Sequence, residues 1–336
     1  MKPRLSRDAL SIDLEAVSST IAKRLNQTVR GILHRKGAVV GISGGIDSAV
    51  TTALCAKALG PENVQGLFTP ERDSSEETLR LSRGVAESQG VSAILEDITP
   101  ILEAAGCYRR RDEFYKQAIP EYGPGWRAKI VLPSVVDGDQ YRIFSLVAYS
   151  PDGKTIKKRL PLEAYLGVVA STNFKQRTRK MLEYYHADRR HFCVAGTPNR
   201  LEYDQGFFVK GGDGLADFKP IAHLYKTQVY ALAAYLGIPE EVRNRPPTTD
   251  TYSIPQGQDE FYFSLPYEQM DLCLYGKNHG YTAAEVAEVL ELQPVQIERV
   301  YRDIDGKRRT TSYLHQKPVL MDAVPEVVLD LPSFDP

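Results

Sequence analysis

The sequence holds few cysteines, and their spacing forms no recognisable framework. Only four occur among 336 residues, at Cys55, Cys107, Cys193 and Cys273. None belongs to a CxxC pair or has a histidine at the spacing of a metal knuckle. This pattern excludes a secreted disulfide scaffold and favours a reduced, intracellular protein, so we expect a cytoplasmic location.

Long apolar runs and an excess of either charge are also missing. No segment approaches the roughly 18 apolar residues of a membrane span, and residues 1–17 lack the apolar stretch of a signal peptide. Lysine and arginine total 42 against 43 for aspartate and glutamate, which gives a net charge of −1. This balance argues against a dedicated nucleic-acid binder, although one local basic face stays open. We therefore expect neither a membrane nor a nucleic acid as a partner.

The chain does have apolar material for a core and an alternation of apolar runs with amphipathic segments. Hydrophobic residues make up 42% of it, a globular balance. Apolar residues at helical spacing predict a helix over 11–36 that ends at Gly37. Strands are then predicted at 37–42, 63–70 and 91–98, and helices at 48–60 and 76–90. This order predicts an α/β fold with a doubly wound parallel sheet.

The alternation of predicted strands and helices changes in the middle of the chain. Residues 105–165 look β-rich, with Pro-Asp-Gly at 151–153 as a hairpin turn, and we interpret them as an inserted β-rich element. The α/β pattern resumes with a helix at 173–186, a strand at 191–197 and a helix at 223–237. We expect four segments: 1–104 with the N-terminal helix and the first part of the α/β domain, 105–165 with the insertion, 166–275 with the second part of that domain, and 276–336 with a helical C-terminal region and tail.

The segment from Gly41 to Ser48 carries the clearest chemical signal. It places Ser-Gly-Gly-Ile-Asp-Ser where a buried strand meets a helix, so the backbone can approach a ligand closely and the helix N-terminus favours an anion. Ser43 and Ser48 add hydroxyl donors, and Asp47 adds a carboxylate suited to Mg²⁺. No Gly-Lys-Ser/Thr follows, which excludes a Walker A loop, and the glycine spacing excludes the dinucleotide fingerprint. An ordinary strand-to-helix turn is the plain alternative, and a phosphate loop is favoured over it.

Residues 41–48, GISGGIDS, resemble the pyrophosphate loop of the ATP pyrophosphatase superfamily, which has the Rossmann-like fold of the adenine nucleotide alpha hydrolases. Its members cleave ATP to AMP and pyrophosphate while activating a carbonyl or carboxylate oxygen. The second half narrows the choice, because four further stretches resemble NAD synthetase: 173–185, 195–221, 224–239 and 245–250.

The resemblance implies roles for individual residues. The ATP-contacting set comprises the loop and three further positions: Gly41, Ile42, Ser43, Gly44, Gly45, Ile46, Asp47, Ser48, Thr197, Lys226 and Thr248. The Mg²⁺ positions are Asp47 and Glu202, and the catalytic set is Asp47, Lys210 and Lys226. The positions that bind deamido-NAD are Arg177, Lys210, Asp217 and His315. In the closing stretch His315 matches the family, whereas Gln316 stands where a lysine is usual.

The implied reaction is the amidation of a carboxylate. Because an unactivated carboxylate cannot expel oxide, ATP converts it to an acyl-adenylate, which ammonia attacks with release of AMP. Two anions meet in the first step, so Mg²⁺ and cationic side chains matter more than a covalent nucleophile. The resemblance implies ATP, deamido-NAD, ammonia and Mg²⁺ as ligands and a homodimer as the assembly. No glutaminase domain fits before residue 37, so ammonia is either free or supplied by a separate glutaminase subunit.

Several alternatives stay open. A ligase of the same mechanism could act on another carboxylate, presented by a partner protein. Each site residue could instead be a solvated or turn-forming side chain, as an isolated lysine usually is. The basic clusters at 109–111 and 154–159 fit either a solvated hairpin or a lid or docking surface. Helices at 282–308, close to the run Gly-Lys-Arg-Arg, could imitate a helix-turn-helix that docks nucleic acid.

Overall fold

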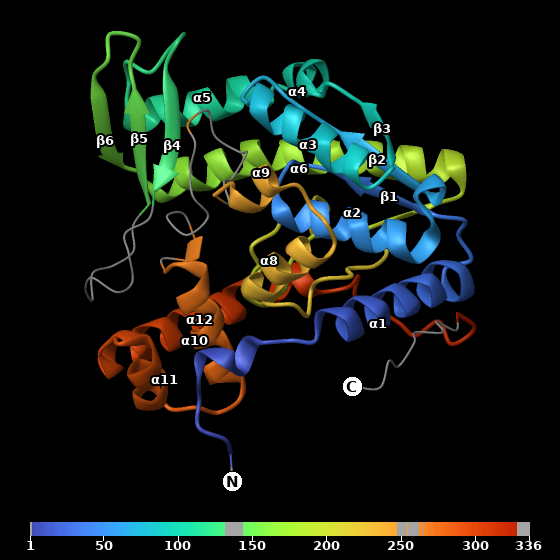
Figure 1. The fold of residues 1–336 in the computed structure, drawn as a ribbon. Helices are drawn as coiled ribbons and strands as arrows, with labels where there is room; N and C mark the ends of the chain where they lie inside the picture. Colours follow the sequence, from blue (N-terminus) through green and yellow to red (C-terminus); the bar gives the residue numbers. More distant parts are fainter. Residues whose placement is uncertain (1, 132–143, 247–253, 255–261, 264, 328–336) are drawn as a thin grey trace.

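A parallel four-stranded sheet forms the centre of the molecule (Figure 1). The structure is a computed structural model that describes residues 2–131, 144–246, 254, 262–263 and 265–327. The strand order is β3-β2-β1-β7, with β1 at Ala38–Gly41, β2 at Val64–Phe68, β3 at Ser92–Leu95 and β7 at Cys193–Val194. The predicted α/β fold with a doubly wound parallel sheet is confirmed.

Both faces of this sheet are covered, which explains why its strands are continuous apolar runs. One face receives the long helix α6, Leu162–Arg190, and on that side Val39 of β1 packs in a cluster with Ala187 and Phe192. The other face receives α1, Leu14–Asn26, α2, Ile46–Leu59, and α3, Glu76–Ser88, and α8, Lys226–Tyr235, packs on α1 and α2. On that side Val40 packs with Leu25 of α1 and Cys55 of α2.

The first predicted helix ends earlier than expected. Helix α1 ends at Asn26 and continues as a wider π-helical turn, η2, over Gln27–Ile32, after which His34 takes a φ of 50°. Gly37 therefore does not end the helix. A Cβ atom at Gly37 would lie 2.1 Å from the backbone oxygen of Asn63, so glycine is required there because two backbones approach closely.

The inserted element contains the expected antiparallel hairpins. Strands β4, Arg127–Val131, β5, Ser145–Tyr149, and β6, Thr155–Arg159, form a separate three-stranded sheet at one end of the molecule (Figure 1). The predicted Pro-Asp-Gly turn is confirmed, because the N–H of Gly153 donates to the oxygen of Ser150 at 3.0 Å and Gly153 has a φ of 85°.

The first part of the segment 105–165 is helical, and in this respect the prediction of a β-rich element was wrong. Helix α4 covers Thr99–Ala104 and helix α5 covers Cys107–Ala118. Three of the α5 residues buried against α6 are Tyr108, Arg111 and Tyr115, which recur every three or four positions. Because polar and aromatic residues fill this face, no apolar helical period is visible in the sequence.

The helical C-terminal region is confirmed. It contains α10, Tyr267–Asn278, α11, Ala283–Leu290, and α12, Pro294–His315. These helices form a second core with the N-terminal segment, which contributes Leu5 and Leu10. Within the described residues, no helix is long and apolar enough to cross a membrane.

Two helical glycines provide a test of the contact between α5 and α6. A Cβ atom at Gly167 of α6 would lie 2.4 Å from the ring of Phe114, whereas one at Gly84 of α3 would meet nothing within 4 Å. We expect Gly167→Ala to destabilise the protein by about 1–3 kcal/mol through overpacking. Gly84→Ala should stabilise it by about 0.5–1 kcal/mol through helix propensity. Urea unfolding measures both, and a Gly167→Ala variant at least as stable as the wild type would contradict the described packing.

Candidate active site

The predicted phosphate loop lies at the carboxyl end of β1, where a doubly wound sheet binds ligands. The chain leaves the sheet at Ile42, whose N–H donates to the oxygen of Leu67 in β2 at 2.9 Å. Gly45 precedes α2, and no described side chain caps the first turn of this helix. The opening N–H groups of α2 and the positive end of its dipole are therefore left for an anion.

Gly44 fixes the path of this loop. It adopts a φ of 69°, and a Cβ atom there would lie 2.7 Å from the backbone oxygen of Thr78 in α3. The loop is also braced from within, because the Ser43 N–H donates to Ser48 Oγ at 3.2 Å and Ser48 Oγ donates to the oxygen of Gly45 at 2.9 Å. The phosphate loop is thus held closely against α3.

Three charged side chains that the sequence had placed far apart meet beside this loop. The Lys226 ammonium, 1% exposed at the start of α8, forms an ion pair with Oδ2 of Asp47. Asn199 Nδ2 donates to the other Asp47 oxygen at 3.1 Å, and the Asn199 N–H donates to Glu202 Oε2 at 3.0 Å. Helix α7, Arg200–Gln205, thereby brings Glu202 to the same place as Asp47.

The charges of this cluster do not balance. The buried carboxylate of Glu202 and the half-buried one of Asp47 share one buried ammonium, and burial together with the charge of Asp47 raises the pKa of Glu202 to about 8. Burial disfavours the charged form of Lys226, but the carboxylates of Asp47 and Glu202 outweigh it and raise the pKa of this lysine. The cluster therefore retains a lysine cation and has room for further positive charge.

Sequence reasoning missed two residues that position this cluster. Asn199 caps α7 in a capping box with Glu202, and the spacing Asn-x-x-Glu was a usable signal for it. Asp271 of α10 is fully buried, and its carboxylate accepts from the N–H groups of Lys226 at 3.2 Å and Thr227 at 2.7 Å. Asp271 thus caps α8, and only the tertiary fold places it there.

A cavity of about 420 Å³ unites these groups. The phosphate loop, Thr197, Glu202 and Lys226 line it, together with the segment after β2 and one side of α6. Lys180 and Glu183 of α6 also line it and pair with each other at 2.5 Å. The insertion contributes an aromatic part of the wall, where the rings of Phe144 and Tyr165 stack with centroids 4.1 Å apart.

The predicted site residues separate into two groups. Of the ATP-contacting set, all but Gly44 and Thr248 line the cavity: Gly41, Ile42, Ser43, Gly45, Ile46, Asp47, Ser48, Thr197 and Lys226. Gly44 shapes the loop from outside, and Thr248 lies outside the described residues. The four predicted substrate positions do not line the cavity: Arg177, Lys210, Asp217 and His315.

Two of these residues, Arg177 and Lys210, lie next to cavity-lining residues at the rim. Lys210 Nζ donates to the backbone oxygens of Tyr313 at 2.9 Å and Gln316 at 3.1 Å, and so holds the end of α12. Arg177 Nε donates to the oxygen of Lys210 at 3.2 Å. Arg177, Lys210 and the end of α12 therefore lie together.

The other two predicted substrate residues serve the local structure. Asp217 accepts from the N–H of Val194 in β7 at 2.7 Å and from the Tyr184 hydroxyl at 3.2 Å. The His315 ring packs edge-on against the rings of Tyr203 and Phe208. Phe208 also lines the cavity, so the end of α12 reaches its wall.

The donor set fits Mg²⁺. This ion prefers oxygen ligands, keeps several waters and needs only one or two carboxylates when phosphates supply the rest. Asp47 and Glu202 offer two carboxylates beside the phosphate loop. Across the described residues, no group of three or more His, Cys, Asp or Glu could hold a metal alone.

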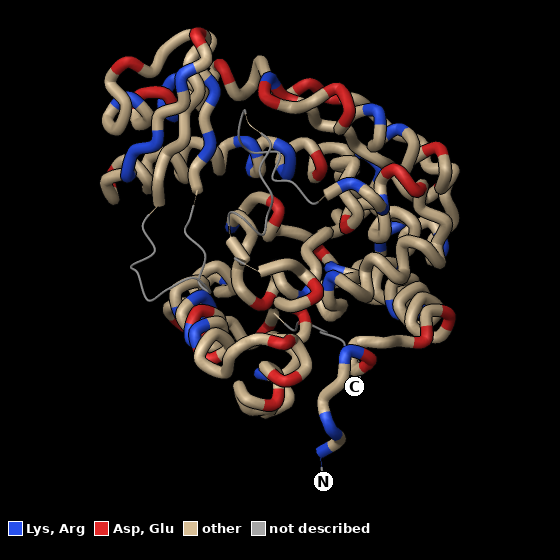
Figure 2. Tube along the Cα trace, turned by 60° about the vertical axis from the view of Figure 1, so that its left-hand side comes forward, with Lys and Arg blue, Asp and Glu red and all other residues tan. Residues whose placement is uncertain are grey.

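Two cations of the basic run at 307–309 form ion pairs within the protein. Arg308 makes two bonds to Asp204 at 2.7 and 2.6 Å, and Lys307 pairs with Asp303 at 2.7 Å. Figure 2 shows further basic residues on the strands of the three-stranded sheet. Most of the cations near the end of α12 are thus bonded within the protein.

The raised pKa of Glu202 predicts a pH dependence of stability. A group with a folded pKa near 8 and an ordinary value of 4.5 stabilises the fold below about pH 4.5, and this contribution is lost as the pH rises through 8. Relative to Glu202→Gln, the wild type should therefore lose on the order of a few kcal/mol between pH 5 and 8. Urea unfolding of both proteins across this range measures the difference.

Glu285 provides a matched control for this measurement. Glu285 belongs to a capping box of the same type at the start of α11. The hydrogen bond from the Thr282 N–H lowers the pKa of Glu285, so the stability that Glu285 contributes is lost only in acid. Glu285→Gln should differ from the wild type by a constant amount between pH 5 and 8. A constant difference for Glu202→Gln as well would refute the electrostatic description of the site.

Comparison with known proteins connects this geometry to a family. A family model described as NAD synthase matches residues 17–118 and 150–311. The chain is 58% identical over 322 residues to an NH(3)-dependent NAD(+) synthetase from Rhizobium meliloti (strain 1021), which covers 96% of each protein. It is 34% identical over 290 residues to an NH(3)-dependent NAD(+) synthetase from Thermotoga neapolitana, which covers 86% of this chain and 91% of the relative.

Solved structures agree on the fold. NMN synthetase from Francisella tularensis superposes with a TM-score of 0.65 at 18% identity, over 93% of this chain and 100% of that chain. The NH3-dependent NAD synthetase from Campylobacter jejuni superposes with a TM-score of 0.60 at 22% identity, with the same coverage. At these identities the two structures carry the fold alone. The family model and the sequence relatives also identify the family: the chain belongs to the NAD synthase family.

Proposed function

We propose that this chain is a carbon–nitrogen ligase that converts deamido-NAD, ATP and ammonia to NAD, AMP and pyrophosphate. The observation that carries this proposal is the meeting of an uncapped helix N-terminus with Asp47, Glu202 and Lys226 in one cavity of about 420 Å³. The family assignment and the name NH(3)-dependent NAD(+) synthetase of the 58% identical relative support the substrates. Nothing in the comparisons favours the alternative of a different carboxylate presented by a partner.

The reaction needs an activated acyl group. A carboxylate oxygen of deamido-NAD attacks the α-phosphorus of ATP, and the bond to pyrophosphate breaks. Ammonia then attacks the acyl carbon, AMP leaves with the carboxylate oxygen, and the amide remains. The N–H groups that open α2 bind the phosphates, and Lys226 offsets the charge that develops on the departing pyrophosphate.

Asp47 and Glu202 would hold Mg²⁺ in this cavity. When bound, the ion neutralises and orients phosphate oxygens. Both residues are held in place: Asp47, in the first turn of α2, by Asn199 and Lys226, and Glu202, in the first turn of α7, by its capping box with Asn199. Lys226 remains in contact with Asp47 and adds a second positive group to the same site.

We assign the carboxylate substrate to the rim next to α12. Arg177 and Lys210 offer two cations there, and His315 is the last residue of the same helix α12. Deamido-NAD is a dianionic dinucleotide too long for the phosphate site alone, so contacts beyond the cavity are required. The lysines thus divide their roles, with Lys226 at the reacting phosphates and Lys210 at the distant part of deamido-NAD.

Ammonia arrives free or from a separate glutaminase subunit. All four cysteines are unpaired and buried: Cys55, Cys107, Cys193 and Cys273. Burial raises the pKa of Cys193 and Cys273 to about 12 and that of the other two above the ordinary value, so none is a ready thiolate for glutamine hydrolysis. Unpaired cysteines also support a reducing compartment, and we propose the cytoplasm.

We further propose that the enzyme is a homodimer. Helix α6 exposes four large apolar side chains, Leu162, Leu166, Met181 and Tyr185, at 72%, 55%, 54% and 55%. At 100° per residue they fall within a sector of about 140° on one side of the helix. The four residues form two exposed apolar pairs, one near each end of α6, and a second copy of the chain can cover both symmetrically.

Two lysine variants test the division of labour in catalysis. Lys226→Met should lower kcat by at least about 100-fold, because the lost cation acts on charge that develops in the transition state. Lys210→Met should mainly raise the KM for deamido-NAD and leave kcat within about 10-fold, since uniform binding is lost. An amidation assay with ATP, Mg²⁺, ammonia and deamido-NAD measures both. Equal effects of the two variants on kcat would contradict the assignment.

The dimer has its own test. Leu166→Glu combined with Met181→Glu should halve the mass measured by light scattering, because two charges on the apolar face of α6 oppose association. The control is Val295→Glu, which alters a residue of α12 that is 48% exposed and lies off that face. A wild type that is monomeric at all concentrations would refute the homodimer.

A further inference from the structure

The loop between β2 and α3 forms one wall of the active-site cavity. Thr69, Pro70, Ser74 and Ser75 of this loop line the cavity. The loop leads into α3, whose Thr78 oxygen contacts the phosphate loop at Gly44. Any shift of this loop therefore changes the space next to the phosphate site.

The two acidic residues of the loop do not line this cavity. Glu71 is 4% exposed, and the carboxylates of Glu71 and Asp73 both meet the ammonium of Lys175 in α6, at 2.7 and 2.9 Å. Lys175 itself is only 1% exposed. A buried lysine on α6 thus holds two points of the loop that lie between its two pairs of cavity-lining residues.

Helix α5 completes the network. The hydroxyl of Tyr108 donates to Glu71 Oε2 at 2.7 Å, and Arg111 pairs with Asp73 Oδ2 at 2.7 Å. The guanidinium of Arg72 lies over the Tyr108 ring at 3.6 Å from its centroid. The front helix of the 105–165 segment is therefore bonded to the cavity wall through three consecutive loop residues.

The charges in this network balance. Three carboxylates, of Glu71, Asp73 and Asp112, face three cations, of Lys175, Arg111 and Arg72. Although burial disfavours its charged form, Lys175 and Arg111 hold the pKa of Asp73 below its ordinary value. Burial and the contact with Glu71 raise the pKa of the Tyr108 hydroxyl, so it stays a donor. A satisfied buried network fixes geometry, whereas a broken one leaves an uncompensated charge.

We propose that Tyr108, Arg111 and Lys175 are positioning residues that hold the loop 69–75 in the shape required to bind ATP. The role assigned to helix α5 is thus to set the affinity for the nucleotide without contacting it. This inference rests on the proposed function only in taking ATP as the occupant of the cavity. Sites of this kind are held by supporting residues whose own positions are fixed by packing and hydrogen bonds.

Tyr108→Phe tests the proposal with a small change. It removes one hydroxyl from the network, and the dissociation constant for ATP with Mg²⁺, measured by calorimetry, should rise by about 2- to 10-fold. In turnover assays the KM for ATP should rise likewise, while kcat and the KM for ammonia stay unchanged. Calorimetry needs no carboxylate substrate, so a protein that binds ATP but does not amidate deamido-NAD refutes the proposed function and leaves this test intact.

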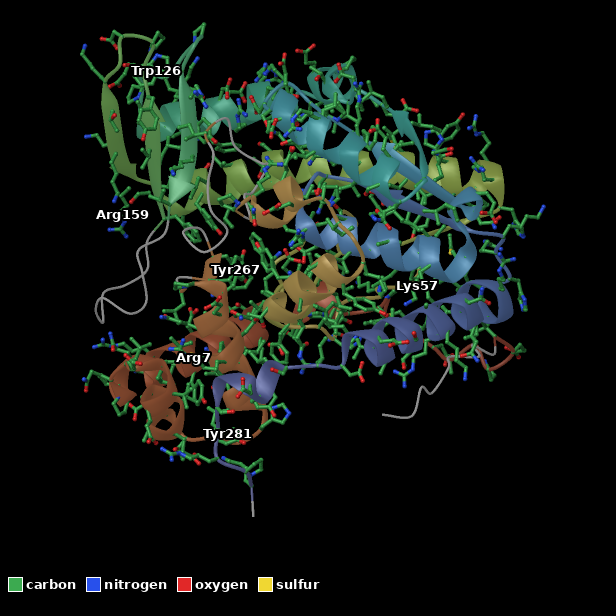
Figure 3. The ribbon with its side chains drawn as sticks, in the orientation of Figure 1. Arg7, Lys57, Trp126, Arg159, Tyr267 and Tyr281 are labelled. Atoms are coloured by element: carbon green, nitrogen blue, oxygen red, sulfur yellow. The ribbon has the colours of Figure 1, made fainter. Side chains whose placement is uncertain are left out.

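Tyr281→Phe is the matched control. Tyr281 is 5% exposed, its hydroxyl donates to the oxygen of Pro3 at 2.9 Å, and it lies in the C-terminal helical region away from α5 (Figures 1 and 3). It should lose comparable stability in urea but bind ATP as the wild type does. An equal loss of ATP affinity in the control, or none in Tyr108→Phe, overturns the proposal.

A second pair of variants distinguishes the loss of a charge from misfolding. Arg111→Lys keeps a cation for Asp73, whereas Arg111→Met leaves that carboxylate with one partner fewer. We expect the lysine variant to restore most of the ATP affinity lost in the methionine variant. Equal affinity in the two folded variants contradicts a positioning role for the charge.

Discussion

The ion pair between Lys226 and Asp47 is the contact on which the active site depends. It joins the first turn of α8 to the first turn of α2, and these helices belong to parts of the chain separated by 179 residues. The N-termini of both helices point at the same cavity, so one buried contact sets the distance between the phosphate loop and its cation. Asp271 supports this contact by capping α8 from a third part of the chain.

The central sheet makes this convergence possible. Its parallel strands all end at one edge, and the segments that follow β1, β2 and β7 contribute the phosphate loop, the loop at 69–75 and Thr197 to one cavity. Because helices cover both faces of the sheet, ligands can approach only at that edge. The long helix α6 closes the side of the cavity and at the same time exposes an apolar face to its surroundings.

The sequence was sufficient for the parts of the fold and site that depend on local pattern. Buried strands such as β1 are continuous apolar runs, and Asp47 lies inside a compact motif, so both could be predicted. Arg111 could not, because a buried arginine paired with Asp73 looks like a solvated one in the sequence. Lys210 and Asp217 were expected beside the ligand, but their contacts lie at the rim and at β7, and only the tertiary fold decides this. The start of α6 at Leu162 could not be predicted, because the exposed apolar residues of its first turns break the amphipathic pattern.

Two buried charge clusters flank the same cavity, and their balance separates their roles. In the network around Lys175 and Arg111 the negative charges of Glu71, Asp73 and Asp112 are matched by three positive ones, with Arg72 as the third, so it requires no ligand and acts as a fixed support. In the cluster of Asp47, Glu202 and Lys226 two carboxylates face one ammonium, and without a ligand Glu202 compensates by holding a proton. A bound cation can replace that proton, whereas the balanced network has no excess charge for a ligand to compensate. The imbalance therefore supports the proposal that the cluster next to the phosphate loop holds Mg²⁺ and phosphates.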